Sequence, residues 1–539
     1  MVIRYRRLIT NILFLVLLSP TSLLAQSTSS ESFLNVGLVI MAVIVFITAL
    51  ILVGDNLIGI EAKEGKVNIP STGGFSRLFA KKPAKYVEGS YHALTRGFDI
   101  KLTGEAKKEV ESIPVSAVAL QPPNFTGMSP IPKVLFEPGQ EVLAGDALFF
   151  DKKRPDIKYV SPVSGEVAAI NRGEKRAITE IVIIPDKEQR YRQVPSVDLN
   201  TVSREELITF LIDTGAWPFI RQRPYNLVAK PGDVPENIFV STFDTAPLAP
   251  DNDFIIQGQE NEWEKGIETL TKLTDGKVYL GLNANGTDAP AKAFTNISSA
   301  EKVWFSGPHP VGNVGVQIHH IHPVSSTNIA WVLGVQDVIV IGRLFTEGRF
   351  NAERLVALTG QGVEDRKYVR VPLGAKISEL VKGQELTDAH RIISGDVLSG
   401  HKKSKEGYLD FYDDQLTVID EGKEYEMFGW LLPLKMRPST SKTYPNFMFP
   451  DVEFEVNTNT HGERRAFVVT GQYESMLPMD IYPQHLMKAI LTNDYEKMEG
   501  LGIHELAEED IALCEFACTS KQPLQHILRQ GLDMMREQG

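Results

Sequence analysis

The stretch 306–324, SGPHPVGNVGVQIHHIHPV, holds three glycines and four histidines, residue types that can cradle a phosphate or bind a metal. A dinucleotide-binding loop needs G-x-G-x-x-G, because closely spaced glycines let backbone N–H groups approach a pyrophosphate. The glycines here stand at 307, 312 and 315, so that spacing fails, and no G-K-[ST] follows for a mononucleotide loop. The pattern favours a structural loop, with ligand contact as the alternative.

The histidines of this stretch raise the second possibility, a metal site. If QIHHIHPV is a strand, alternation puts His320 and His322 on one face and His319 on the other. Two ligands on a face are too few for a metal site, and nothing in the spacing supports His309 or a distant carboxylate as a further one. We therefore expect no bound metal and hydrogen-bonded histidines.

The two cysteines of the chain, Cys514 and Cys518, stand in LCEFACTSK. An iron–sulfur cluster normally needs four thiolates, often in a C-x2-C-x2-C-x3-C-P run. One x3 spacing is present here, Thr519 replaces the proline, and on a helix the pair would share one face. The pattern predicts packing thiols, with a disulfide or redox role as the alternative.

Two further stretches, WPFIRQRPYN and NFTGMSPIP, combine ring side chains with hydrogen-bond donors, as a quinone slot requires. Packing between domains is the competing explanation, and no catalytic acid or base is assigned. The candidates for quinone contact are Trp217, Phe219, Arg221, Arg223, Tyr225, Phe125, Gly127 and Met128.

The composition bounds the classes of function. A chain of 539 residues, 43% hydrophobic and 23% charged, is long enough for three or four globular domains. A net charge of -12 without a cluster of Lys and Arg argues against a nucleic-acid partner. Two cysteines give no disulfide framework and indicate a reducing compartment.

The N-terminal part differs from the rest. Three arginines precede an apolar run, so residues 1–25 are expected to be a signal peptide or a first membrane helix. Residues 36–54, with Thr48 as their one strongly polar side chain, predict a transmembrane helix. Lys and Arg are absent from 26–35 and frequent afterwards, which places the main body on the cytoplasmic side. Residues 55–88 are predicted to be a tether.

Beyond the tether, the pattern predicts an α+β multidomain chain. In 89–190, PGQEVLAGDAL and SPVSGEVAAI resemble the halves of a lipoyl-like barrel-sandwich, with Lys152 and Lys153 where a carrier would hold its attachment lysine. The flanking residues are not those of a carrier, so that role is the minor alternative.

The rest of the chain is divided into three predicted domains. In 191–365, the expected strands NIFVSTF, KVYLGL, KVWFSG and DVIVIG alternate with helical segments, as in a Rossmann-like α/β domain. Residues 366–435 contain short strands and one helix, and 436–539 have helical apolar spacing.

A family resemblance rests on segments that follow one another in order: LTRGFDIKLTGEA, NRGEKRAI, RQRPYNLVAKPGDVPENIFVSTFDTAPLAP, HPVGNVG, RIISGDVLSGH, YESMLPMDIYPQHLM and EEDIALCEFAC. They resemble the A subunits of the sodium-translocating NADH:quinone oxidoreductases over about residues 90–539. The usual member of this family begins near LTRGFDI, so residues 1–88 are an addition.

The resemblance implies a six-subunit inner-membrane pump that passes electrons from NADH to quinone and moves sodium outward. A member of the family is expected to be a cytoplasmic part related in fold to the flavin- and NADH-binding subunit of respiratory complex I, with 366–435 as a β-grasp domain. The resemblance implies no cofactor in this chain, with NADH, FAD, FMN, iron–sulfur and quinone in the whole complex. The expected partners are the other five subunits and ubiquinone or menaquinone. A cofactor-bearing, NADH-oxidising subunit is the alternative.

Overall fold

The computed structural model describes residues 41–43, 45–46, 83–424, 436–440, 445–449, 451–468 and 471–538. The predicted segment 1–25 and nearly all of 36–54 and 55–82 lie outside these residues. Within the part that the structure describes, no helix is both long and apolar enough to cross a membrane. The chain forms two units, Met1–Lys82 and Pro83–Gly539, and the second contains the sheets and the packed helices.

The packed body begins at Pro83, within the predicted tether. Tyr86 already belongs to it, because its hydroxyl donates to the Gly286 carbonyl at 2.8 Å and its ring lies 5.5 Å from that of Trp304. The last residues of the predicted tether, 83–88, are therefore part of the folded body.

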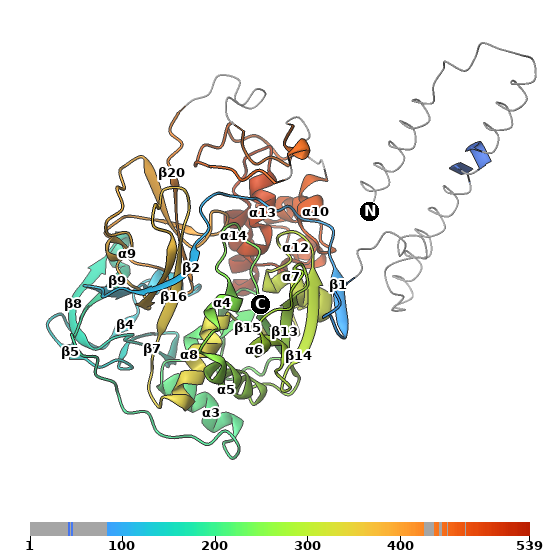
Figure 1. The fold of residues 1–539 in the computed structure, drawn as a ribbon. Coiled ribbons are helices and arrows are strands. Elements are labelled where there is room, and N and C mark those ends of the chain that lie inside the picture. The colour runs from blue at the N-terminus through green and yellow to red at the C-terminus, as the bar shows by residue number, and fades with distance from the viewer. Residues whose placement is uncertain are drawn as a thin grey trace, which may run out of the picture. The chain divides into compact units, whose positions relative to one another are not determined.

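The largest sheet of the body has seven strands in the order β1-β14-β13-β12-β15-β10-β11. Figure 1 labels four of them, β1, β14, β13 and β15. The first five strands are parallel, whereas β10 and β11 are antiparallel. NIFVSTF, KVYLGL and KVWFSG provide β12, β13 and β14, which confirms those three predicted strands. The strands are β1 (Ser90–Ala93), β10 (Arg221–Arg223), β11 (Leu227–Val228), β12 (Asn237–Ser241), β13 (Lys277–Asn283), β14 (Glu301–Ser306) and β15 (Ala330–Leu333).

The prediction of a fourth strand at DVIVIG is wrong, because these residues lie inside helix α8. An apolar run that is buried all round has no periodicity to separate a strand from a helix, and the true strand, AWVL, stands just before it. The helices of this domain are α3 (Arg204–Asp213), α4 (Asn252–Ile255), α5 (Glu260–Thr271), α6 (Lys292–Thr295), α7 (Val314–Ile321) and α8 (Val335–Thr346).

Before this domain in the chain, two small sheets, β3-β9-β8-β5 and β4-β6-β7, contribute buried side chains to one apolar core. Phe149 and Tyr159 stack at 4.9 Å in their shared core, and Lys152 and Lys153 form the exposed turn between β6 and β7. The strands are β3 (Val118–Leu120), β4 (Lys133–Val134), β5 (Glu141–Val142), β6 (Ala147–Asp151), β7 (Arg154–Val160), β8 (Gly165–Arg172) and β9 (Ile178–Pro185).

A six-stranded sheet, β19-β18-β20-β16-β17-β2, follows the α/β domain. Its edge strand β2 comes from the part of the chain that precedes the small sheets and pairs in parallel with β17. The elements are β2 (Lys107–Ser112), β16 (Glu353–Thr359), β17 (Lys367–Pro372), α9 (Ile377–Leu380), β18 (His390–Ser394), β19 (His401–Lys403) and β20 (Gln415–Asp420).

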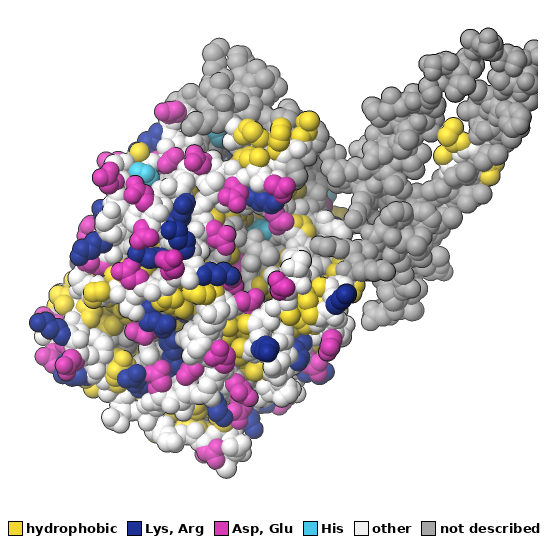
Figure 2. All heavy atoms as spheres, viewed as in Figure 1, with side chains coloured by type: hydrophobic (Ala, Val, Ile, Leu, Met, Phe, Trp, Pro, Cys, Tyr) yellow, Lys and Arg dark blue, Asp and Glu magenta, His cyan; other side chains and the backbone are white. Residues whose placement is uncertain are grey.

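The C-terminal part is helical and has its own apolar core around Leu486, Ile511 and Leu528. Its elements are α10 (Gln472–Met476), α11 (Pro483–Leu491), α12 (Tyr495–Gly500), α13 (Glu508–Ala517) and α14 (Leu524–Gln538). On the face of the molecule in Figure 2, Lys and Arg are interspersed with Asp and Glu, so neither sign of charge is gathered in one area.

Candidate functional site

The Gly/His stretch lies at the carboxyl edge of the parallel sheet, where α/β folds place their ligand loops. It leaves β14, and its loop is fixed by Ser241, whose hydroxyl donates to the Gly312 carbonyl at 2.8 Å, and by Thr245, whose hydroxyl accepts from the Gly312 N–H at 3.0 Å. Of the histidines that follow, His319 and His320 belong to α7 and His322 lies just past its end, so the strand alternation assumed for them does not apply. Helix and strand could not be separated over so short an apolar run.

A carboxylate from a distant part of the chain lies against the first turn of α7. A Cβ atom on Gly315 would lie 2.6 Å from Oδ1 of Asp510 and closer still to Oδ2, so only glycine leaves room for this carboxylate. Beside it, the Asn313 side-chain amide donates to the Glu509 carbonyl at 3.0 Å. The first turns of α7 and α13 are therefore in direct contact.

Arg223 faces this carboxylate from the sheet side. It is 1% exposed, and its guanidinium lies 2.7 Å from Oε1 of Glu509 and 3.5 Å from Oδ2 of Asp510. Burial raises the pKa of Asp510 to about 7, with Arg223 acting against the rise and Glu509 adding to it. Arg223, expected as a quinone donor, instead forms a buried ion pair.

The histidines of α7 hold the C-terminal helical part. Nδ1 of His319 lies 2.6 Å from Glu505, and Nε2 of His320 lies 2.8 Å from the Pro478 carbonyl, so it donates there. Burial lowers the pKa of His320 to about 4. His322, just past the helix, lies 3.1 Å from Glu236. The three rings thus point to different partners, and the described residues contain no group of three or more His, Cys, Asp or Glu side chains placed to hold a metal ion.

The two thiols lie around Tyr473 in the C-terminal core. The Tyr473 hydroxyl is 2.8 Å from Sγ of Cys518, and the Cys514 thiol donates to the Tyr473 carbonyl at 3.5 Å. Helix α13 ends at Ala517 and Cys518 has extended backbone, so the predicted common helix face is wrong at its last residue. Both thiols are buried, and burial raises the pKa of Cys514, which keeps it protonated and unreactive.

The ring residues proposed for quinone contact lie in the core of the chain. Trp217 and Phe219 are 0% exposed and Phe125 is 2% exposed. The indole N–H of Trp217 donates to the Ala229 carbonyl at 2.8 Å, and Phe219 stacks on Phe411 at 4.9 Å. These rings are fully used in packing.

The remaining candidates lie where the two predicted stretches meet. A Cβ on Gly127 would be 3.1 Å from the Leu227 side chain and would also touch the Arg536 guanidinium, which comes from α14. Gly127 is exposed, and Met128 and Tyr225 are half-buried. Arg221 is half-buried, with its guanidinium 5.1 Å from the ring centre of Tyr412. The structure therefore brings the two stretches together, although their rings do not form an open slot.

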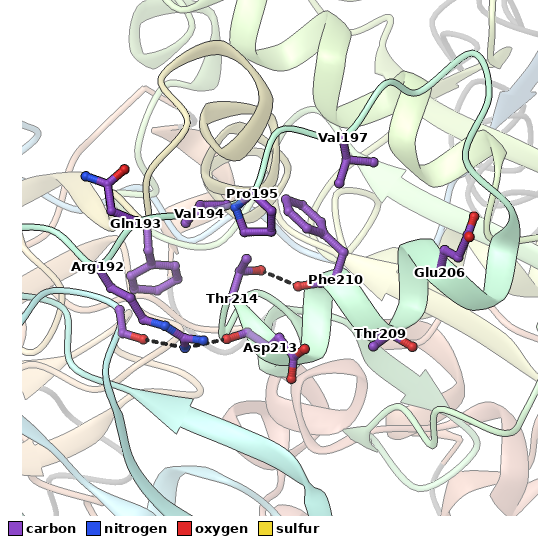
Figure 3. Close-up of a pocket in the computed structure, with 12 residues that line it drawn as sticks. Arg192, Gln193, Val194, Pro195, Val197, Glu206, Thr209, Phe210, Asp213 and Thr214 are labelled. Carbon is purple, nitrogen blue, oxygen red and sulfur yellow. Dashed lines mark hydrogen bonds between the residues drawn. The ribbon is translucent and has the colours of Figure 1, made fainter.

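A separate cavity of about 270 Å³ lies between the segment 192–197 and helix α3 (Figure 3). Its wall is mostly apolar, and Arg192 closes one end by donating to the Asp213 carbonyl at 2.9 Å. None of the residues predicted for quinone contact lines it, and its residue types carry no motif that sequence reasoning could have used. The lining residues are Gly145, Arg192, Gln193, Val194, Pro195, Val197, Glu206, Thr209, Phe210, Asp213, Thr214 and Phe350.

Three protein-family models match successive parts of the chain. Residues 93–186 match the NqrA N-terminal barrel-sandwich hybrid domain, residues 202–350 the NqrA second alpha/beta domain, and residues 355–405 the NQRA C-terminal domain. These matches agree with the barrel-sandwich and α/β parts of the predicted fold. A solved NAD+-reducing [NiFe]-hydrogenase chain aligns over 65% of this chain and 67% of its own, but a TM-score of 0.31 and 11% identity are too low to indicate a shared fold.

Curated relatives match most of the chain. The A subunit of the Na(+)-translocating NADH-quinone reductase of Yersinia pestis bv. Antiqua (strain Angola) is 38% identical over 450 residues, which are 83% of this chain and 99% of the relative. The corresponding protein of Saccharophagus degradans shows the same identity over the same shares, and that of Alcanivorax borkumensis is 36% identical over 451 residues. The chain therefore belongs to the NqrA family, the A subunits of the Na(+)-translocating NADH-quinone reductases.

Proposed function

We propose that the chain acts as a cofactor-free subunit of a membrane complex that transfers electrons from NADH to quinone and moves sodium out of the cell. The place of the chain in this complex is inferred from its membership of the NqrA family. The observation that supports the cofactor-free role is the Asp510 carboxylate, which lies against Gly315 in the first turn of α7, beside the place where a nucleotide-binding fold would hold a phosphate. The thiols at 514 and 518 are buried around a tyrosine, and the sequence has no third cysteine to extend them into a cluster site.

The competing function is that of a subunit that binds a flavin and oxidises NADH. Two measurements on the full chain, purified in detergent, distinguish these functions. The first is flavin fluorescence after acid release, and the second is NADH oxidation by an artificial acceptor. We expect neither flavin nor oxidation. Stoichiometric flavin with turnover that survives further purification would establish the competing function.

We propose that residues 36–54 anchor the chain in the inner membrane and that the main body faces the cytoplasm. The charge distribution supports this orientation, since Lys and Arg follow the apolar segment and are absent from 26–35. A reporter enzyme fused after Lys85 is expected to be active only as a cytoplasmic fusion. Periplasmic activity at that junction would reverse the topology.

For the complex, we propose contact with the other five subunits and with ubiquinone or menaquinone. Of the residues predicted for quinone contact, the exposed or half-buried group of Gly127, Met128 and Tyr225 keeps surface for it, with the Arg536 guanidinium beside it as a donor. Photoaffinity labelling of the assembled complex with a quinone analogue should mark this group. The variant Tyr225→Ala should reduce the labelling, and Tyr482→Ala, an exposed tyrosine elsewhere on the chain, should not.

A further inference from the structure

We propose that the first turn of α7 and the Arg223 guanidinium together form an anion-binding position, and that the carboxylate of the chain's own Asp510, which lies against Gly315, blocks this position. The position has the chemistry to take a phosphate group, and Asp510 keeps such a group out. This inference deepens the proposed cofactor-free function and rests on it.

The first observation is the uncapped start of α7. The helix runs over Val314–Ile321, its N-cap residue Asn313 makes no side-chain capping bond, and its first turn has no acidic residue. The first N–H groups of a helix carry a partial positive charge and need acceptors. A carboxylate lies against this turn, but it arrives from α13, almost two hundred residues later. The carboxylate thus reaches this turn through tertiary structure and lies against Gly315, while its hydrogen bond comes from the Ala507 N–H of its own segment.

The second observation is a surplus of buried donors. Arg223 is 1% exposed, and its Nε and Nη1 groups have no hydrogen-bond partner among the described residues. The nearby carboxylate, Asp510, is also 1% exposed, and its Oδ1 has no partner within the same part of the chain. The 3.5 Å between Nη1 and Oδ2 is an ion pair and too long for a good hydrogen bond. A guanidinium suits the several oxygens of a phosphate better than one carboxylate held at this distance.

Asp510 has a second, local role that the test must separate from the first. Its Oδ2 accepts the Ala507 N–H at 2.9 Å and so caps α13. A loss of stability in an Asp510 variant would follow from that cap alone, because a capping carboxylate satisfies N–H groups that otherwise lack an acceptor. The discriminating measurement is therefore the response to an added anion.

The experiment follows thermal unfolding of the full chain in detergent at pH 8, with inorganic phosphate titrated against chloride at constant ionic strength. The variants are Asp510→Asn, which keeps the shape of the side chain, and Asp510→Ala, which leaves space. Asp494→Asn is the matched control, because Asp494 caps the first turn of α12 through the Lys497 N–H and pairs there with an exposed lysine instead of a buried arginine.

We expect phosphate to raise the unfolding midpoint of both Asp510 variants by several degrees in a saturating manner, as ligand binding to the native state requires. The wild-type chain and the control should not respond, and Arg223→Gln in the Asp510→Asn background should remove the effect. Adenosine monophosphate, tested in parallel, shows whether the opened space also admits a nucleotide. If a variant is unfolded without phosphate, recovery of its native fluorescence in phosphate supports the proposal.

The proposal is overturned if both variants show no more phosphate response than the wild-type chain, or stay unfolded at every phosphate concentration. Such a result would leave the cofactor-free function standing, since that function is judged on the flavin content and NADH oxidation of the unaltered chain. Conversely, flavin in the wild-type chain would refute the proposed function whatever the variants do.

Discussion

The backbone N–H of Asp480 donates to Nε2 of His319 at 3.1 Å, which fixes the tautomer of that ring. Because Nε2 must present its lone pair, the proton of the neutral ring sits on Nδ1 and is donated to Glu505 at 2.6 Å. A histidine that joins two segments in this way cannot also bind a metal through Nε2. The ring therefore acts as a structural link between α7 and the C-terminal helical part.

His320, next in the sequence, should make stability fall in acid. Its pKa is lowered from 6.5 to about 4 by burial, so the unfolded chain takes up a proton before the folded chain does. The stabilisation is complete above pH 6.5 and is lost as the pH falls towards 4. In His320→Gln, which can still donate to Pro478, this loss should be absent from urea unfolding curves. Equal pH dependence of both proteins would contradict the expectation.

Asp510 should act in the opposite direction over nearly the same range. Burial raises its pKa from 3.8 to about 7, so the folded chain holds a proton that the unfolded chain has released. Its contribution to stability is therefore greatest near pH 4 and is lost as the pH rises to about 7. The difference in unfolding free energy between the wild-type chain and Asp510→Asn should follow this course. Arg223 and Glu509, which face the carboxyl group, are unchanged in both proteins.

Replacing Arg223 should destabilise the chain strongly. At pH 8, above the raised pKa of Asp510, Arg223→Ala leaves this carboxylate buried without its cation, and breaking a buried ion pair from one side costs about 3–5 kcal/mol. Arg190→Ala is the control, because Arg190 pairs with Glu141 and Asp186 while about half exposed, and such pairs contribute about 0–1 kcal/mol. Denaturant unfolding measures both. Equal losses of unfolding free energy in the two variants would contradict the expectation that the buried Arg223 pair contributes more than the exposed Arg190 pairs.

The contact between α5 and α8 should not tolerate a methyl group. A Cβ on Gly342 would lie 2.6 Å from the carbonyl carbon of Glu262 and closer still to its oxygen, so Gly342→Ala must push the helices apart. The loss should exceed the gain of about 1 kcal/mol that alanine brings to a helix. Gly500→Ala, in α12 with open space around it, should be neutral or slightly stabilising. The thermal unfolding midpoints of both variants are compared with that of the wild-type chain. A Gly342→Ala midpoint equal to that of the wild-type chain would contradict the close packing of the two helices.

Much of the architecture could be predicted because it depends on local patterns. The strands KVYLGL and KVWFSG are short apolar runs bounded by turn residues, and the turn at Lys152 and Lys153 follows from the apolar pieces on either side. The helical state of DVIVIG and QIHHI could not be predicted, since a short segment that is buried on several sides shows neither the helix period nor the strand period clearly. Their helical state is decided by the sheet and the helices that pack on them.

The sequence by itself determined the family and the failure of the glycine spacing at 307, 312 and 315, because each depends on residue identity along the chain. The assignment of 89–190 to one domain is wrong at its start, because β1 and β2 pair with strands of the other two large sheets. Only the tertiary structure decided what lies against the first turn of α7. Arg223 and Asp510 are almost three hundred residues apart, and no local pattern signals that they meet. Folding brought them together, and burial then raised the pKa of Asp510 to about 7, well above its value in water.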